Sequence, residues 1–263
     1  MAVLRARSVA VATGVPALFA LLAGILTVAV PNPVAQAEEV AAAPAVVRPP
    51  LVIAPFATTR ALPQPGYRPI PVTDRIRTAD QVAFITIDDG VHKDPDALAF
   101  VEERQLPVTA FLSAWTIKDQ AEYFTRITAW GSIQNHSATH ASFADETTDL
   151  NHEICYSQKA MRKAFGSKPW MLRPPYGAGA DRFGTVLTAQ RCGIREIVMW
   201  DATVSDGKVR LATGELHPGS ILLLHFGPDL ARDLKAAVRA IRDAGLAPGR
   251  LADYLPTSTP EVS

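Results

Sequence analysis

The fold can be inferred from one short segment, Phe84-Ile85-Thr86-Ile87-Asp88-Asp89-Gly90. This short apolar, β-branched run ends in two carboxylates and a glycine, which predicts a buried strand that delivers both acids to a turn at its C-terminal end. Adjacent side chains leave the end of a strand in different directions, so one carboxylate can bind a metal ion while its neighbour faces a reacting water. Asp-Asp-Gly is also ordinary turn chemistry, and the functional interpretation therefore depends on the rest of the chain.

Composition limits the architecture and the partners. The chain has 263 residues, of which 48% are hydrophobic and 20% charged, and its formal net charge is zero. A chain of this length can bury one sizeable core, so we expect a single barrel or α/β domain of about 200 residues with a tail. No run of Lys and Arg is interleaved with aromatic residues, which argues against nucleic acid and against an anionic membrane surface as partners.

The N-terminus resembles an export signal. Arg5 and Arg7 precede an apolar run, and Ala35-Gln36-Ala37 follows it. This order predicts a signal peptide over residues 1–37 and a protein that is secreted or associated with the cell wall. The alternative is an uncleaved membrane anchor, because the apolar run is long enough to span a bilayer. The Ala- and Pro-rich residues 38–75 are predicted to form an extended linker, which leaves residues 76–258 for the folded domain.

Strand-like and helix-like segments alternate along that domain. The predicted strands are 83–88, 108–113, 132–135, 170–173, 196–200, 221–225 and a weak last one at 250–254. The predicted helices are 95–104, 121–130, 148–165, 181–191 and 229–244. This alternation indicates βα units, a parallel sheet and a closed or nearly closed barrel, in which functional residues gather at the C-terminal strand ends.

Polar side chains follow several of these strands. His136 and His140 are four residues apart, and with one carboxylate they supply three ligands, which leaves the open position of a catalytic Zn²⁺ site. The residue after the first histidine is Ser137 rather than the glutamate base of the zincin motif, so the base must come from elsewhere, and Asp88 is available. Taken alone, a histidine pair with this spacing is more often a pair of surface residues.

Five short motifs together resemble one family. They are Ile87-Asp88-Asp89-Gly90, His136 to His140, Arg173-Pro174-Pro175-Tyr176, Trp200 to Asp206 and Leu223-Leu224-His225. In order and spacing they are similar to the motifs of the polysaccharide deacetylase (NodB-homology) family of carbohydrate esterases, over about residues 83–255. The resemblance implies a distorted (β/α) barrel of about seven parallel strands, and it makes residues 76–258 the catalytic domain.

The resemblance also implies roles for single residues. Asp89, His136 and His140 would hold one divalent metal ion, expected to be Zn²⁺ with Co²⁺ or Mn²⁺ as alternatives. Asp88 would be the general base, and Arg173 would orient and ionise it.

Four further residues complete the implied site. His225 would be the general acid, kept charged by Asp206. Tyr176 would offer its backbone N–H to the oxyanion, and Leu223 would line the pocket for the acetyl methyl group. One departure is Gly207, because the family usually has a tryptophan at that position. Either the wall of the cleft beside the base would then be more open, or another aromatic residue such as Trp200 or Phe226 would fill the space.

The implied function is that of an exported metal-dependent hydrolase of carbon–nitrogen bonds other than peptide bonds. It would remove N-acetyl groups from the sugars of a polymer such as peptidoglycan or chitin and act as a monomer. Two alternatives stay open, an O-acetyl esterase acting on xylan and a non-catalytic glycan-binding relative.

Cys155 and Cys192 are the chain's two cysteines. They lie on helices that a sequential barrel could place side by side, and an exported protein favours oxidation, so we predict a disulfide between them. The alternative is a pair of buried free cysteines.

Overall fold

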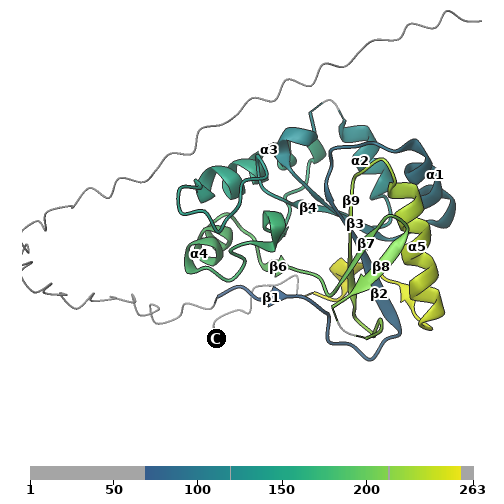
Figure 1. Cartoon of the computed structure of the whole chain (residues 1–263). Coiled ribbons are helices and arrows are strands. Elements are labelled where there is room, and N and C mark those ends of the chain that lie inside the picture. The colour runs from purple at the N-terminus through teal and green to yellow at the C-terminus, as the bar shows by residue number, and fades with distance from the viewer. Residues whose placement is uncertain (1–68, 119, 213, 256–263) are drawn as a thin grey trace, which may run out of the picture. The chain divides into compact units, whose positions relative to one another are not determined.

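A computed structural model describes residues 69–118, 120–212 and 214–255 (Figure 1). The predicted signal peptide, the linker up to residue 68 and residues 256–258 of the predicted domain lie outside the described residues, so the domain boundaries stay predictions. No helix in the described part is long and apolar enough to cross a bilayer.

The strands form one mostly parallel sheet, in agreement with the predicted distorted (β/α) barrel. The sheet has ten strands rather than about seven, in the order β1-β6-β5-β4-β3-β2-β9-β7-β8, with β10 paired to β2. The strands are β1 Val72–Thr73, β2 Val82–Asp89, β3 Val108–Leu112, β4 Ser132–Asn135, β5 Met171–Leu172, β6 Glu196–Val198, β7 Ala202–Ser205, β8 Lys208–Leu211, β9 Ile221–His225 and β10 Ala247–Pro248. Among these strands, the antiparallel pair is β7 with β8.

Helices cover the outside of this sheet (Figure 1). The α-helices are α1 Pro95–Arg104, α2 Ala121–Ile127, α3 Ser157–Phe165, α4 Phe183–Arg191 and α5 Leu230–Asp243. The short helices are η1 Ala114–Thr116, η3 Pro175–Gly177 and η4 Leu251–Asp253, which are 3₁₀, and η2 Asn151–Tyr156, which is π-helical. The single helix predicted over 148–165 is therefore η2 followed by α3.

The side chains of β2 show how the sequence places the site. Ala83, Ile85 and Ile87 pack in the core cluster under α1 and α5, while Phe84 packs in a second cluster with Phe111 and other residues of the barrel interior. Because side chains alternate along a strand, the inward row continues from Phe84 through Thr86 to Asp88. The segment from Phe84 to Gly90 therefore places the side chain of Asp88 in the barrel interior.

The structure corrects the prediction at the end of the domain. The prediction of a strand at 250–254 is wrong, because that segment contains the 3₁₀ helix η4. The last strand is β10, which precedes η4 in the sequence. Pro248 made β10 difficult to predict from the sequence, because proline is uncommon inside a strand. It is tolerated because the ladder uses the N–H groups on either side, which donate from Ala247 to Gln81 O and from Gly249 to Ala83 O.

Three further strands, β7, β8 and β1, are absent from the prediction. β7 and β8 form a hairpin whose two turn residues, Asp206 and Gly207, have φ of 55° and 70°. Positive φ at both positions is the type I′ geometry that suits a two-residue hairpin turn. At the other end of the sheet, Val72 and Thr73 pair with β6, so the last part of the predicted linker joins the sheet as β1.

Candidate metal and catalytic site

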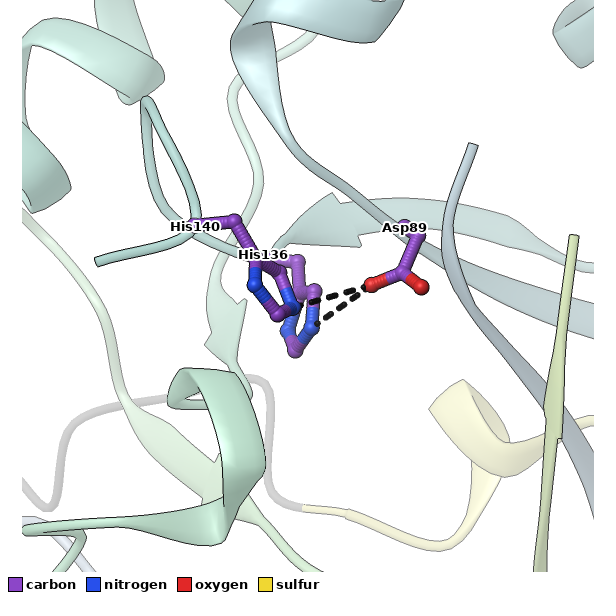
Figure 2. Close-up of side chains that lie close together, drawn as sticks. All are labelled: Asp89, His136 and His140. Carbon is purple, nitrogen blue, oxygen red and sulfur yellow. Dashed lines mark ion pairs between the residues drawn. The ribbon is translucent and has the colours of Figure 1, made fainter. Parts of the chain in front are cut away.

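Three predicted metal ligands converge at the C-terminal end of β2 (Figure 2). Asp89 Oδ1 lies 3.1 Å from His140 Nε2 and 3.3 Å from His136 Nε2. The three ligand atoms lie within 4.8 Å of one another. Asp89 ends β2, and both histidines belong to the loop that follows β4. These two parallel strands flank β3, so their C-terminal ends lie at the same edge of the sheet.

The donor set fits a divalent metal ion. Asp89 Oδ1 is buried and has no hydrogen-bond partner among the described residues, although both ring nitrogens are close to it. A buried carboxylate oxygen without a partner calls for an explanation, and a cation supplies one. Tetrahedral zinc with ligands at about 2.0–2.2 Å would separate the ligand atoms by roughly 3.3–3.6 Å, which is close to the distances from Asp89 to the two imidazoles.

The carboxylate of Asp89 and the imidazole of His140 shift each other's pKa values. Burial raises the pKa of Asp89, but the neighbouring imidazoles of His136 and His140 outweigh that effect, and the pKa of Asp89 lies well below its ordinary value. The nearby carboxylate of Asp89 raises the pKa of His140. The site is therefore arranged around an ionised Asp89, as metal ligation requires.

A backbone carbonyl group fixes the orientation of the His136 ring. Its Nδ1 lies 2.8 Å from the carbonyl oxygen of Arg173. A carbonyl can only accept, so Nδ1 carries the proton and the lone pair of Nε2 faces Asp89. This is the tautomer that a metal ligand needs.

The loops around the site adopt unusual backbone angles. Four site residues that are not glycine have positive φ, namely Asp89 at 81°, Ser137 at 76°, His140 at 69° and Tyr176 at 61°. Such angles are costly for these residues and gather at functional sites, where the surrounding structure must hold them. Part of that support is local, because Ser137 Oγ accepts from the His140 N–H at 2.9 Å.

A buried glutamate that the sequence did not indicate holds the histidine loop. Glu153 accepts from the backbone N–H groups of Ala138 and Thr139 at 3.1 and 2.9 Å and from the Thr139 hydroxyl at 2.7 Å. It lies in the π-helical η2, a form that is frequent at functional sites. In sequence, an acidic residue on a helix resembles a solvated surface group, so no pattern could have singled it out.

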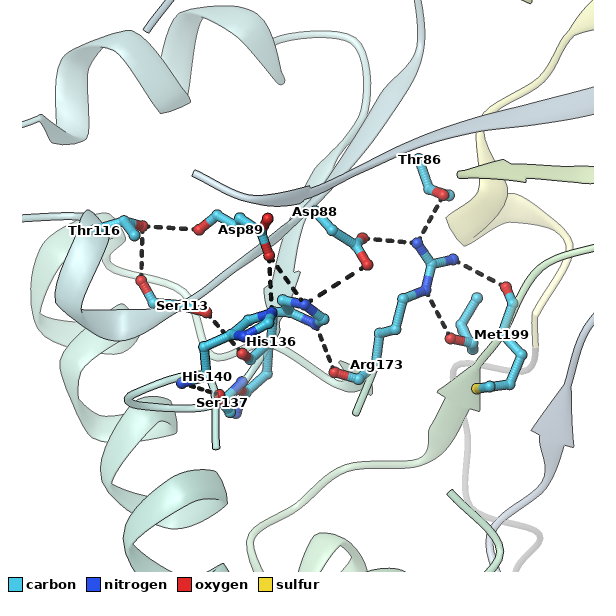
Figure 3. A network of polar contacts seen from close by, with 12 residues as sticks. Thr86, Asp88, Asp89, Ser113, Thr116, His136, Ser137, His140, Arg173 and Met199 are labelled. Carbon is cyan, nitrogen blue, oxygen red and sulfur yellow. Dashed lines mark hydrogen bonds and ion pairs between the residues drawn. The ribbon is translucent and has the colours of Figure 1, made fainter. Parts of the chain in front are cut away.

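Asp88 and Arg173 form a buried ion pair beside the metal ligands (Figure 3). Arg173 Nη1 donates to Asp88 Oδ1 at 2.7 Å and to the Thr86 hydroxyl at 2.8 Å. Its other nitrogens donate to the carbonyl oxygens of Val198 and Met199, each at 2.9 Å. The second Asp88 oxygen, Oδ2, remains on the side of His136 Nε2, 3.7 Å away.

The remaining predicted residues surround this centre. His225 ends β9 directly opposite Asp88 in the parallel ladder, and its side chain is exposed. Leu223 is buried on the same strand, opposite Thr86. The Tyr176 ring is exposed and packs edge-on against the His140 ring, with centroids 4.7 Å apart.

The structure does not bring Asp206 to His225. Asp206 occupies the tip of the β7–β8 hairpin with its side chain 71% exposed, and its partner is Arg232 of α5 at 3.4 Å. Ala202 and Val204 of β7 pack under the helices, whereas Leu223 and His225 of β9 lie on the other face of the sheet. Asp206 lies beyond the end of β7, in the turn. The expectation that Asp206 keeps His225 charged is therefore not supported by the geometry.

Gly207 belongs to the same turn and not to the cleft wall. Its N–H donates to Asp233 of α5 at 2.7 Å, and a Cβ at this position would approach Arg232. Trp200 lies 5.5 Å from the Arg173 guanidinium, while Phe226 packs in the core under the helices. Of the two aromatic residues suggested by the sequence, Trp200 is the one beside the buried ion pair.

The predicted disulfide is confirmed. Cys155 of η2 and Cys192, at the end of α4, are bonded with their Cα atoms 5.1 Å apart. The bond ties the helix that carries Glu153 to the helix before β6.

Comparisons with known proteins agree on one family. A family model described as polysaccharide deacetylase matches residues 75–197. An uncharacterised protein of Streptomyces coelicolor is 35% identical over 199 residues, which cover 72% of this chain and 79% of that protein. A chitooligosaccharide deacetylase of Sinorhizobium fredii is 27% identical and is covered to 82%, with 63% of this chain aligned.

A solved structure shows the same fold. The crystal structure of a CE4-family pseudoenzyme from Bacillus anthracis superposes with a TM-score of 0.59, at 20% sequence identity, over 72% of this chain and 70% of that chain.

Proposed function

Because this chain belongs to the polysaccharide deacetylase family, we propose that it is an exported, metal-dependent hydrolase that removes N-acetyl groups from the sugars of a polymer such as peptidoglycan or chitin. The observation that carries the proposal is the position of the Asp89–His136–His140 triad next to the buried Asp88–Arg173 pair. Metal ligands and a separate carboxylate base are the two parts that metal-assisted hydrolysis needs.

The three ligands would hold one divalent ion, with Zn²⁺ favoured by two imidazoles and a carboxylate and Co²⁺ or Mn²⁺ as alternatives. When bound, such an ion lowers the pKa of a water molecule and polarises the carbonyl oxygen of the acetyl group. Asp89, His136 and His140 supply the fixed geometry.

Asp88 is the proposed general base. Arg173 holds Oδ1, so the carboxylate cannot rotate, and Oδ2 faces the triad. A fixed carboxylate at this distance can take the proton of the attacking water without first paying for reorientation.

His225 and Tyr176 are the proposed partners of the leaving group and of the oxyanion. His225 lies opposite Asp88 and is exposed, so it can give a proton to the amine as the carbon–nitrogen bond breaks. The backbone N–H of Tyr176, in the turn against His140, would donate to the oxyanion, and Leu223 would contact the acetyl methyl group.

Two other functions compete with this one. An O-acetyl esterase could use the same residues, because ester and amide hydrolysis share the tetrahedral intermediate. A non-catalytic glycan-binding protein is also a candidate, since the Bacillus anthracis structure of the same fold is a pseudoenzyme. Catalysis is favoured because this chain has all three metal ligands and also the base, Asp88, in an ion pair with Arg173.

Export rests on the sequence of residues 1–37 and on the disulfide. A bond between Cys155 and Cys192 suits an oxidising compartment outside the cytoplasm. Sequencing the N-terminus of the protein recovered from the culture medium and from membranes would distinguish a cleaved signal from an anchor.

The decisive experiment measures acetate release by the purified protein. The protein is stripped with a chelator, reloaded with Zn²⁺, Co²⁺ or Mn²⁺, and supplied with N-acetylated glucosamine oligomers, peptidoglycan or O-acetylated xylan. We expect release from the N-acetylated substrates only after reloading. Release from xylan alone would favour the esterase, and binding without release from any substrate would favour the pseudoenzyme.

A further inference from the structure

A concave surface is formed by η1, the beginning of α2, the end of η2 and α3. It is a groove of about 840 Å³. Trp115 and Tyr156 line it with 56% and 53% of their surface exposed. Lys118, Lys159 and Lys163 also line it, with alanines between them. A groove of this size is large enough for sugar rings.

Both sides of this groove are hydrogen-bonded to the loop that carries His136 and His140. On one side, the Trp115 N–H donates to Ala138 O at 3.2 Å. On the other side, Ser157 Oγ, at the start of α3, donates to Ser137 O at 3.0 Å. The groove therefore adjoins the loop that carries two of the metal ligands.

The two aromatic rings offer flat apolar faces. The Tyr156 ring stacks on His152, with centroids 4.8 Å apart and planes at 9°, which holds it in place. Such rings contact the C–H faces of sugars at a low cost in conformational entropy. Two large aromatic side chains exposed in one groove indicate a binding surface.

The charge in the groove has one sign. Three of its lining residues are lysines and none is acidic, and no ion pair joins these lysines to another residue in the part of the chain that the structure describes. Lysine ammonium groups are compact point charges on flexible stems, which can follow carboxylates along a polymer. The complementary occupant is an anionic glycan.

Building on the proposed function, we propose that this groove binds the sugars that flank the reacting one and selects N-acetylated strands that carry carboxylate groups over neutral strands. Lactyl ethers and uronic acids are two sources of such carboxylates, and they share the chemistry that the lysines recognise. Trp115 and Tyr156 would contact the rings, and the lysines would contact the acids.

The test compares kcat/KM for metal-loaded full-length protein on three sets of N-acetylated oligosaccharides of equal length. One set is neutral, one carries lactyl carboxylates and one carries uronic acids. The Lys118→Gln, Lys159→Gln, Lys163→Gln triple variant should lower the ratio of acidic to neutral kcat/KM by roughly 3- to 30-fold. Added salt should lower the same ratio in the wild type. Trp115→Ala should raise KM for acidic and neutral strands by roughly 2- to 10-fold.

The matched control is Lys208→Gln on β8, an exposed lysine outside the groove, which should leave the ratio at the wild-type value. An unchanged ratio in the triple variant would overturn the proposal. If no acetate is released from any set, the proposed function fails, and the groove is then tested by calorimetric binding of the same oligosaccharides to wild type and triple variant. Lysine-dependent binding to anionic phospholipid vesicles, without such binding to acidic glycans, would also overturn it.

Discussion

The guanidinium of Arg173 and the carboxylate of Asp88 meet inside the barrel, with Nη1 and Oδ1 2.7 Å apart and both side chains screened from solvent. Arg173 reaches this position from the end of β5. It also donates to Thr86 on β2 and to the carbonyls of Val198, which ends β6, and Met199, which follows it. The proposed base is therefore positioned by a residue that also joins three parts of the sheet.

Replacing Arg173 by leucine should lower the free energy of unfolding by about 3–5 kcal/mol, because Asp88 would stay buried without its counter-ion. Urea unfolding measures the change. The matched control is Arg232→Leu, whose exposed ion pairs with Asp206 and Asp229 should each contribute less than about 1 kcal/mol. Equal effects of the two substitutions would contradict a structural role for the buried pair.

The two adjacent aspartates should respond differently to the same substitution. Asp89→Asn removes an anionic ligand, so metal affinity and acetate release should fall together, and excess metal should restore part of the activity. Asp88→Asn should keep the metal and reduce turnover by about 10²- to 10⁴-fold, because the base is lost. Measuring both the metal content, by atomic spectroscopy, and the acetate release of each variant distinguishes the two roles. An empty site in Asp88→Asn with a filled site in Asp89→Asn would mean that the roles are exchanged.

Asp206→Asn should leave both limbs of the pH–rate profile where they are in the wild type. The family resemblance pairs Asp206 with His225, but in the structure Asp206 contacts Arg232 at an exposed hairpin tip. The measurement is kcat/KM against pH for the two proteins. A downward shift of the alkaline limb in the variant would show that the hairpin closes over His225 during the reaction.

The sequence predicted those parts of the molecule whose local pattern agrees with the final structure. β4, β9 and α1 have the predicted bounds. The apolar run of β9 ends at His225, and α1 begins after the N-cap Asp94, so both have clear local signals. The hairpin was missed because Asp206-Gly207, a common signal for a two-residue turn, was instead interpreted as part of a catalytic motif. Glu153 could not be predicted, because its importance comes from burial against a loop that is distant in sequence.

Glu153→Gln should weaken metal binding by roughly 10- to 100-fold, although Glu153 is not a ligand. The substitution removes the negative charge and one of the two acceptor oxygens. The backbone N–H groups of Ala138 and Thr139 share one of these oxygens and the Thr139 hydroxyl uses the other, so the loop with His136 and His140 would be held less firmly. Competition with a chromophoric chelator gives the metal Kd. Glu146→Gln, an exposed change in a nearby segment, is the control and should keep the wild-type Kd. A Kd that is unchanged in Glu153→Gln would refute the positioning role.

Glu196 should make the stability of the fold depend on pH. Burial raises the pKa of Glu196 above its ordinary value of 4.5, and the hydrogen bond from Thr73 on β1 only partly opposes this. The favourable contribution of the neutral side chain is complete below about pH 4.5 and is lost as the pH rises through the pKa of the folded state, because the folded protein must then bury a charge. Glu196→Gln keeps an acceptor for Thr73 and cannot ionise, so the variant should gain stability relative to the wild type between pH 4.5 and 8.

Urea unfolding of both proteins at several pH values gives this difference. Thr73→Val is the informative companion, because loss of its hydrogen bond should raise the pKa of Glu196 further and extend the pH range over which stability is lost. Glu146→Gln serves again as the exposed control and should follow the wild type at every pH. A stability difference between wild type and Glu196→Gln that stays constant from pH 4.5 to 8 would mean that Glu196 titrates alike in the folded and unfolded chain, and that the pairing of β1 with β6 does not bury its carboxyl group in solution.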